Sequence, residues 1–114
     1  MKMQHVTIQS GAFDEAVKFY QEIVGLKIVG EINGPHHIAF LANGEGETAV
    51  EIIDNPDAAY EGAGISIGFT VDDVEKFRDE LIEKGFEPGP VIRPNPNVKF
   101  FFVKDPSGVS VQFI

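Results

Sequence analysis

The sequence contains no cysteine and no tryptophan, and basic residues are scarce, with 9 lysines and arginines against 18 aspartates and glutamates. Without cysteine, the chain has no disulfide, no thiolate nucleophile and no cysteine-ligated metal. The formal net charge of −9 argues against nucleic acid or an anionic membrane as the main partner. The same charge would suit a cationic small molecule, although many soluble proteins are equally acidic.

Long apolar runs are also missing, so no segment is predicted to span a membrane. The N-terminal stretch has no basic segment followed by an apolar one, and we expect a cytoplasmic protein. With 114 residues, 43% of them hydrophobic, the chain is large enough for one globular domain with a real core, residues 1–114.

The first half of the chain predicts a strand, a helix and three more strands. Apolar residues alternate at 3–9, as in a half-buried strand, and form a helical stripe at 13–25. Segments 26–32, 36–42 and 48–53 read as strands separated by turns that contain glycine and asparagine.

The second half repeats this order of elements. A strand is predicted at 65–71, a helix at 72–85, and three strands at 86–92, 98–104 and 109–114. The fold class is therefore α+β, built from two βαβββ units that each need a partner to bury their apolar surface.

The helix ends carry recognisable signals. Gly25 and Gly85 stand where a left-handed residue would end each helix. Asp72 is expected to cap the second helix, with Glu75 three residues later completing a capping box.

A constant offset of 61 residues supports the repeat. Adding 61 to His5 gives Ser66, and adding 61 to Glu51 gives Gln112. Apolar positions of the first and last strands also map onto apolar positions. We place the first unit at 1–57 and the second at 62–114.

Strand alternation predicts that one face of each sheet packs on the helix and that the other face is polar. The polar set comprises His5, Thr7, Gln9, Glu51, Ser66, Thr70, Ser110 and Gln112. Exposure to solvent explains such a face, and so does a curved sheet whose inner face lines a cleft.

With these features the sequence resembles the vicinal oxygen chelate superfamily, which includes glyoxalase I, the bleomycin-resistance proteins and dioxygenases. The likeness covers nearly the whole chain. It is carried by HVTIQS, FDEAVKFYQEIVGLKIV, AVEII, ISIGFTVDDVEKFRDELIEKGF and DPSGVSVQFI. The resemblance implies curved mixed sheets, each with a helix on its outer face and a concave cleft inside.

The resemblance also implies where a metal would bind, at the first and last strands of each unit. Those places hold His5, Glu51, Ser66 and Gln112. The implied ligands of one divalent ion (Zn, Ni, Mn or Co) are His5, Glu51 and Gln112, with Glu51 also moving the proton in isomerase-type members. Ser66 and Gln112 replace a typical histidine and glutamate. Each lost ligand could remove several of the roughly 10–16 kcal/mol that tight zinc sites supply.

Two functions follow from this set of residues. The first is a cleft protein that binds or sequesters a small molecule without metal, through Thr7, Gln9, Ser66 and Gln112. The second is a metal-dependent lyase or isomerase of the glyoxalase I type. In glutathione-dependent members a basic residue occupies the place of Gln9, and of the three dioxygenase-type ligand positions only His5 is retained. Both functions imply a homodimer, because in this family the cleft is completed by pairing units.

Two further groups have open roles. His36 and His37 are adjacent on a predicted strand, so one of them could supply a third nitrogen to the cleft. Phe100, Phe101 and Phe102 also alternate, so some belong to the core and some could line a pocket. If no metal binds, a direct hydrogen bond between His5 and Glu51 is expected.

Overall fold

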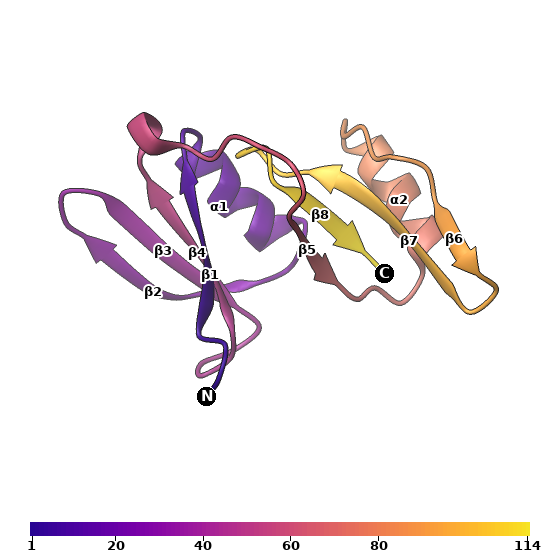
Figure 1. Cartoon of the computed structure of the whole chain (residues 1–114), viewed down its shortest axis with the longest axis horizontal. Coiled ribbons are helices and arrows are strands. Elements are labelled where there is room, and N and C mark those ends of the chain that lie inside the picture. The colour runs from indigo at the N-terminus through magenta and orange to yellow at the C-terminus, as the bar shows by residue number, and fades with distance from the viewer. The chain divides into compact units, whose positions relative to one another are not determined.

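The computed structural model describes residues 1–114 as two compact units, Met1–Gly62 and Ala63–Ile114. Each unit contains one four-stranded mixed sheet and one α-helix (Figure 1). The predicted α+β class with two βαβββ units is confirmed, and neither sheet closes into a barrel.

The first unit has the strand order β1-β4-β3-β2, in which β1 and β4 are parallel and the other neighbours are antiparallel. Its elements are β1 (His5–Ser10), α1 (Phe13–Glu22), β2 (Lys27–Asn33), β3 (His37–Ala42), β4 (Ala49–Asp54) and the short 3₁₀ turn η1 (Pro56–Ala58).

The second unit repeats that topology in the order β5-β8-β7-β6, with β5 and β8 parallel. Its elements are β5 (Ser66–Phe69), α2 (Val74–Glu83), β6 (Ile92–Asn95), β7 (Val98–Lys104) and β8 (Ser110–Phe113).

Each helix covers one face of its own sheet, and the core of each unit lies between its helix and its sheet. In the first unit the buried side chains of α1 are Phe13, Ala16, Phe19 and Tyr20. They share a core with buried strand residues such as Ile8, Ala39, Leu41, Val50 and Ile52. In the second unit Phe77 of α2 packs on Phe113 of β8, with ring centroids 4.7 Å apart. The removal of this apolar surface from water is the main stabilising term in each unit.

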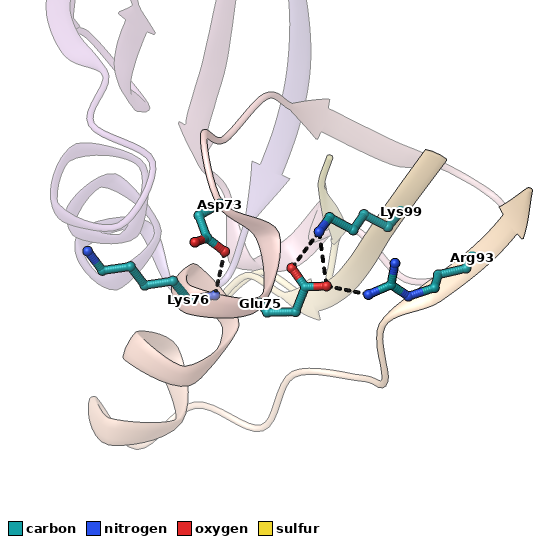
Figure 2. Close-up of polar contacts among 5 residues, drawn as sticks. All are labelled: Asp73, Glu75, Lys76, Arg93 and Lys99. Carbon is teal, nitrogen blue, oxygen red and sulfur yellow. Dashed lines mark hydrogen bonds and ion pairs between the residues drawn. The ribbon is translucent and has the colours of Figure 1, made fainter. Parts of the chain in front are cut away.

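Helix α2 ends as predicted, with Gly85 directly after the C-cap Lys84, whereas α1 ends earlier, at the C-cap Ile23, two residues before Gly25. Helix α2 also begins a residue later than predicted. Gly25 and Gly85 have positive φ angles of 86° and 92°, which glycine adopts without steric cost. Asp73, not Asp72, caps α2, and its side chain accepts a hydrogen bond of 3.1 Å from the backbone N–H of Lys76. Glu75 does not complete a capping box, because its carboxylate binds Lys99 and Arg93 (Figure 2).

Strand β6 lies later in the chain than predicted, because the predicted segment 86–92 overlaps the observed strand, Ile92–Asn95, only at Ile92. Pro88 and Pro90 precede it, and proline lacks the N–H that a strand would donate. The backbone contact in this region is a single hydrogen bond of 2.8 Å from the N–H of Gly89 to the carbonyl of Phe102.

The two sheets pair their parallel strands in the same register. His5 lies opposite Ala49 and Thr7 opposite Glu51 in the first unit. The equivalent pairs of the second unit, 61 residues later, are Ser66–Ser110 and Gly68–Gln112. We call the sheet face turned away from the helix the open face of each unit.

Neither helix is long and apolar enough to cross a membrane.

Candidate functional site

The open face of the first unit brings together His5, Thr7 and Glu51. Thr7 and Glu51 are direct partners across β1 and β4, and the Thr7 hydroxyl donates a hydrogen bond to Glu51 Oε1. His5 Nε2 lies 3.4 Å from the same oxygen. The direct hydrogen bond expected between His5 and Glu51 is thus a longer polar contact, and Thr7 is the closer donor.

An aromatic side chain borders this group. Phe40 of β3 lies opposite Glu51 in the sheet, and its ring meets the His5 ring edge-on with centroids 5.9 Å apart. The Glu51 side chain is 12% exposed and the His5 side chain 36% exposed. The carboxylate is therefore largely sheltered, whereas the imidazole remains accessible from the open face.

A pocket of about 270 Å³ opens beside His5 and Phe40. Its lining also includes Gln4, Val29, Gly30, Gly46, Glu47 and Ala49. Gly30 keeps the space over Phe40 free, since an added Cβ would lie 3.5 Å from the Phe40 ring. The pocket combines an aromatic wall, an imidazole and the carboxylate of Glu47.

The Gln9 side chain is hydrogen-bonded to a neighbouring residue and does not line the pocket. The side-chain amide of Asn55 donates a hydrogen bond of 3.2 Å to Gln9 Oε1. The side-chain carbonyl that could contact a ligand is thus already engaged within the unit.

The open face of the second unit carries Ser66, Gly68, Ser110 and Gln112 in the equivalent places. Phe102 of β7 lies opposite Gln112 and takes the place that Phe40 has beside Glu51. None of these five residues is charged.

A second pocket of about 360 Å³ lies on this face, lined by Gly64, Ile65, Ser66, Phe102 and Ser110. The three consecutive phenylalanines divide as strand alternation predicts. Phe101 is fully buried against the helix, while Phe100 and Phe102 lie on the other face with their rings 5.6 Å apart and nearly perpendicular.

A third hollow of about 390 Å³ lies at the beginning of α2 and is lined in part by Asp72, Asp73 and Lys76. Asp73 is occupied there as the helix cap. This hollow contains none of the predicted site residues.

Neither His36 nor His37 places a ring nitrogen beside Glu51. His37 faces α1, where its ring packs on Phe13 at a centroid distance of 4.6 Å. The Nδ1 atom of His36 lies 2.9 Å from the backbone carbonyl of Asp54, at the far end of β4.

These residues do not supply a complete set of metal ligands. The first unit offers one imidazole and one carboxylate, and the equivalent positions of the second unit offer a hydroxyl and a neutral amide. No group of three or more histidine, aspartate or glutamate side chains is arranged to hold a metal ion. Neither unit by itself therefore offers a full set of the imidazole, thiolate and carboxylate ligands that a divalent transition metal prefers.

Sequence reasoning missed three residues that shape these faces, Phe40, Asn55 and Gly68, and left open which of the three consecutive phenylalanines lines a pocket. Gly68 could have been found, because the offset of 61 that links His5 to Ser66 also links Thr7 to Gly68. Phe40 and Phe102 are related by a shift of 62, one more than the offset, so a constant offset does not detect them.

Comparison with known proteins now identifies the family. The model of the glyoxalase/bleomycin resistance protein/dioxygenase superfamily matches residues 2–113, and the chain belongs to this family. Among curated relatives, the lactoylglutathione lyase of Haemophilus influenzae is 29% identical over the whole chain, which spans 92% of that protein. A probable chloroplastic lactoylglutathione lyase of Arabidopsis thaliana is 31% identical, and the chain spans 35% of its length.

Solved structures agree on the fold. A glyoxalase I variant from Zea mays superposes with a TM-score of 0.80 at 28% identity, over 99% of this chain and 44% of that one. The trypanothione-dependent glyoxalase I of Leishmania major gives 0.81 at 24% identity, over 100% and 86% of the two chains. TnmS3, an antibiotic binding protein from Streptomyces, gives 0.77 at 22% identity, over 99% and 93%.

Proposed function

We propose that this protein binds a small organic ligand on the open faces of its units and holds no divalent ion through a complete set of side-chain ligands. The observation that carries the proposal is the difference between two equivalent pairs of residues. Thr7 and Glu51 are hydrogen-bonded to each other, whereas Gly68 has no side chain to bind Gln112, and the Gln112 amide is uncharged.

The polar chemistry of the two faces supports binding. His5 and Glu47 border a pocket with an aromatic wall, and the second face pairs hydroxyl groups with Phe102. Ligand sites typically combine an apolar lining with a few polar groups that fix orientation. In this proposal Thr7, Gln9, Ser66 and Gln112 contribute to the binding surface. Thr7 acts by holding Glu51, and Gln9 acts through its NH₂ group, because its side-chain carbonyl is bound by Asn55.

A second candidate is a lyase or isomerase of the glyoxalase I type. The polar contact between His5 and Glu51 and the curated relatives named lactoylglutathione lyase favour it. In that case Glu51 would serve as the base, because only Oε1 is engaged by Thr7 and Oε2 has no partner within the chain. A divalent ion would supply Lewis-acid stabilisation of a developing oxyanion.

We further propose that the protein is a homodimer. β1 and β5 are the terminal strands of their sheets, so each has one backbone edge without a neighbour in its own sheet. The unpaired N–H and C=O groups of such an edge offer a template on which a strand of another chain can pair. Apolar side chains near them are exposed, with Met3 67% and Ile65 62% accessible.

Thermal unfolding of chelator-treated protein tests the two candidates against each other. The screen uses small molecules of differing charge, and the proposal expects at least one of them to raise the midpoint without metal. In parallel, protein loaded with Zn or Ni is assayed for isomerisation of the hemithioacetal of methylglyoxal and glutathione. No ligand-induced shift, together with turnover that is lost in Glu51→Gln, would establish the lyase and overturn the binding proposal.

A further inference from the structure

Hydrogen-bonding groups on the open face of the second unit have no partners within the chain. In the first unit Glu51 is bound by Thr7, and Gln9 by Asn55. The equivalent face of the second unit carries Ser66, Ser110 and Gln112, none of which makes a side-chain hydrogen bond in the structure. None of these polar atoms is sealed from solvent, so they are available to a ligand.

Gly68 produces this difference. It occupies the place that Thr7 has in the first unit, directly opposite Gln112. A Cβ at this position would come within 3.0 Å of Gln112 Oε1, closer than ordinary contacts allow. The glycine therefore lets the Gln112 amide lie close to the backbone of β5 and provides no hydroxyl that would bind it.

An uncharged pocket lies along this face. Its volume is about 360 Å³, and Ser66, Ser110 and Phe102 contribute two hydroxyl groups and an aromatic ring to its lining. Phe102 is also the cross-strand neighbour of Gln112. In a chain with net charge −9, a pocket without charged side chains favours a neutral group over an ion, because an ion would lose hydration without gaining a partner of opposite sign.

We propose that this face, which we call the amide subsite (Ser66, Gly68, Phe102, Ser110 and Gln112), binds an uncharged planar group that presents a hydrogen-bond donor beside an acceptor. The inference rests on the proposed ligand-binding function and names the chemistry of one part of the ligand. The Gln112 side chain offers both a carbonyl and an NH₂ group, so it pairs reciprocally with an amide or lactam edge. Phe102 packs against the planar group, and Gly68, which has no side chain, leaves the Gln112 amide without a competing partner on β5.

Three probes of nearly the same shape test the charge of the preferred group: benzamide, benzoate and benzamidinium. Each is titrated into ¹⁵N-labelled, chelator-treated protein up to its solubility limit, and amide chemical shifts are followed. We expect benzamide to shift the backbone signals of Gly68 and Phe102 and the side-chain signal of Gln112. Benzoate and benzamidinium should shift these signals at least several-fold more weakly.

Two variants locate the binding group. Gly68→Thr restores the arrangement of the first unit and should weaken benzamide binding about tenfold, the effect of losing one hydrogen bond and its space. Gln112→Glu keeps the shape but adds a charge, and should reverse the preference in favour of benzamidinium. Gly11→Ala, in the first unit, is the matched control, since its added Cβ makes only an ordinary contact of 3.6 Å with Ala59 of the same unit.

The outcomes separate this inference from the proposed function. Benzamide shifts that are confined to the amide subsite and weakened in Gly68→Thr but not in Gly11→Ala would establish it. Equal binding of all three probes, unchanged binding in Gly68→Thr, or no benzamide shift at Gln112 would overturn it. If some other small molecule still raises the unfolding midpoint of the metal-free protein, the proposed function stands and only the amide subsite is lost.

Discussion

Thr7 and Glu51 face each other across β1 and β4, and the threonine hydroxyl donates to a carboxylate oxygen that also lies 3.4 Å from His5 Nε2. Gly68 and Gln112 hold the same register in the second unit, where neither the hydroxyl nor the charge is present. The repeated fold thus presents a hydrogen-bonded pair with an ionisable carboxylate, Thr7 and Glu51, in the first unit and an unpaired neutral amide, Gln112, in the second.

Replacing Thr7 by valine tests the engaged pair. Valine keeps the shape and suits a strand but leaves Glu51 Oε1 without its closest donor, and the carboxylate is only 12% exposed. We expect a loss of about 1 kcal/mol in the free energy of unfolding, measured by urea denaturation. Equal stability of wild type and Thr7→Val would contradict the importance of this hydrogen bond.

The change in the free energy of unfolding at acid pH tests the ion-pair cluster around Glu75. Its carboxylate lies 2.8 Å from Lys99 Nζ and 2.5 Å from the guanidinium of Arg93, so it links α2 to β7 and β6 (Figure 2). The hydrogen bond from Lys99, aided by the nearby charges of Lys99 and Arg93, holds the pKa of Glu75 below its usual value of 4.5. Because the folded state binds this proton less readily than the unfolded state, the contribution of Glu75 is complete above pH 4.5.

Below that pH the contribution should disappear as the pH falls through the lowered pKa of Glu75. The difference in unfolding free energy between wild type and Glu75→Gln should therefore be constant near neutral pH and shrink in acid. Glu83→Gln, at the other end of the same helix, is the matched control and should show no such trend. A difference that stays constant down to strongly acidic pH would show that the cluster does not depend on the ionised carboxylate.

His37 presents a stabilising opportunity on the helix-facing side of the first sheet. Its Nε2 atom is buried without a hydrogen-bond partner while its ring packs on Phe13. His37→Phe keeps the ring contact and removes the buried polar atom, so we expect a gain of about 1 kcal/mol in thermal or urea unfolding. His36→Phe, which loses the contact with the Asp54 carbonyl, should bring no gain. A destabilised His37→Phe protein would mean that the nitrogen has a partner such as a bound water.

The mass in solution tests the proposed homodimer. Light scattering coupled to gel filtration should give twice the chain mass of 12.5 kDa. Dimers bury surface of both partners by symmetry, so Ile65→Asp, which places a charge on an exposed apolar residue next to β5, should lower the mass toward the monomer. A monomer at high protein concentration would refute the assembly.

Much of the fold could be predicted from local pattern alone. The alternation that buries Ile8 and the helical stripe from Phe13 to Tyr20 reflect packing against a single partner face, and the period of apolar residues in the sequence indicates such packing directly. Val6, on the same face as Ile8, is 36% exposed, so the alternation does not show where burial along the strand begins. The start of β6 could not be located, because its boundary depends on prolines and on one backbone contact with Phe102. The same limit applies to the choice of Asp73 over Asp72 as the N-cap of α2, since both residues are aspartates and the sequence preference for aspartate at an N-cap does not distinguish them.

The candidate site was predictable only where it follows the repeat. His5, Glu51, Ser66 and Gln112 occupy equivalent strand positions and could be placed from the offset. The neighbours that give them their chemistry, Phe40 on β3 and Phe102 on β7, come from antiparallel pairing across turns. The sequence does not record the register of such pairs, so the pockets beside them became visible only in three dimensions.

Metal stoichiometry tests the central claim most directly. Protein purified without chelator is offered Zn, Ni, Mn and Co, desalted and subjected to elemental analysis, with His5→Ala as control and Ser66→His/Gln112→Glu as a variant that supplies the missing ligands. The account predicts that wild type retains no more metal than His5→Ala, while the double variant retains much more. Nearly one ion per chain in wild type, lost in His5→Ala, would contradict the account and return the protein to the metal-dependent lyases.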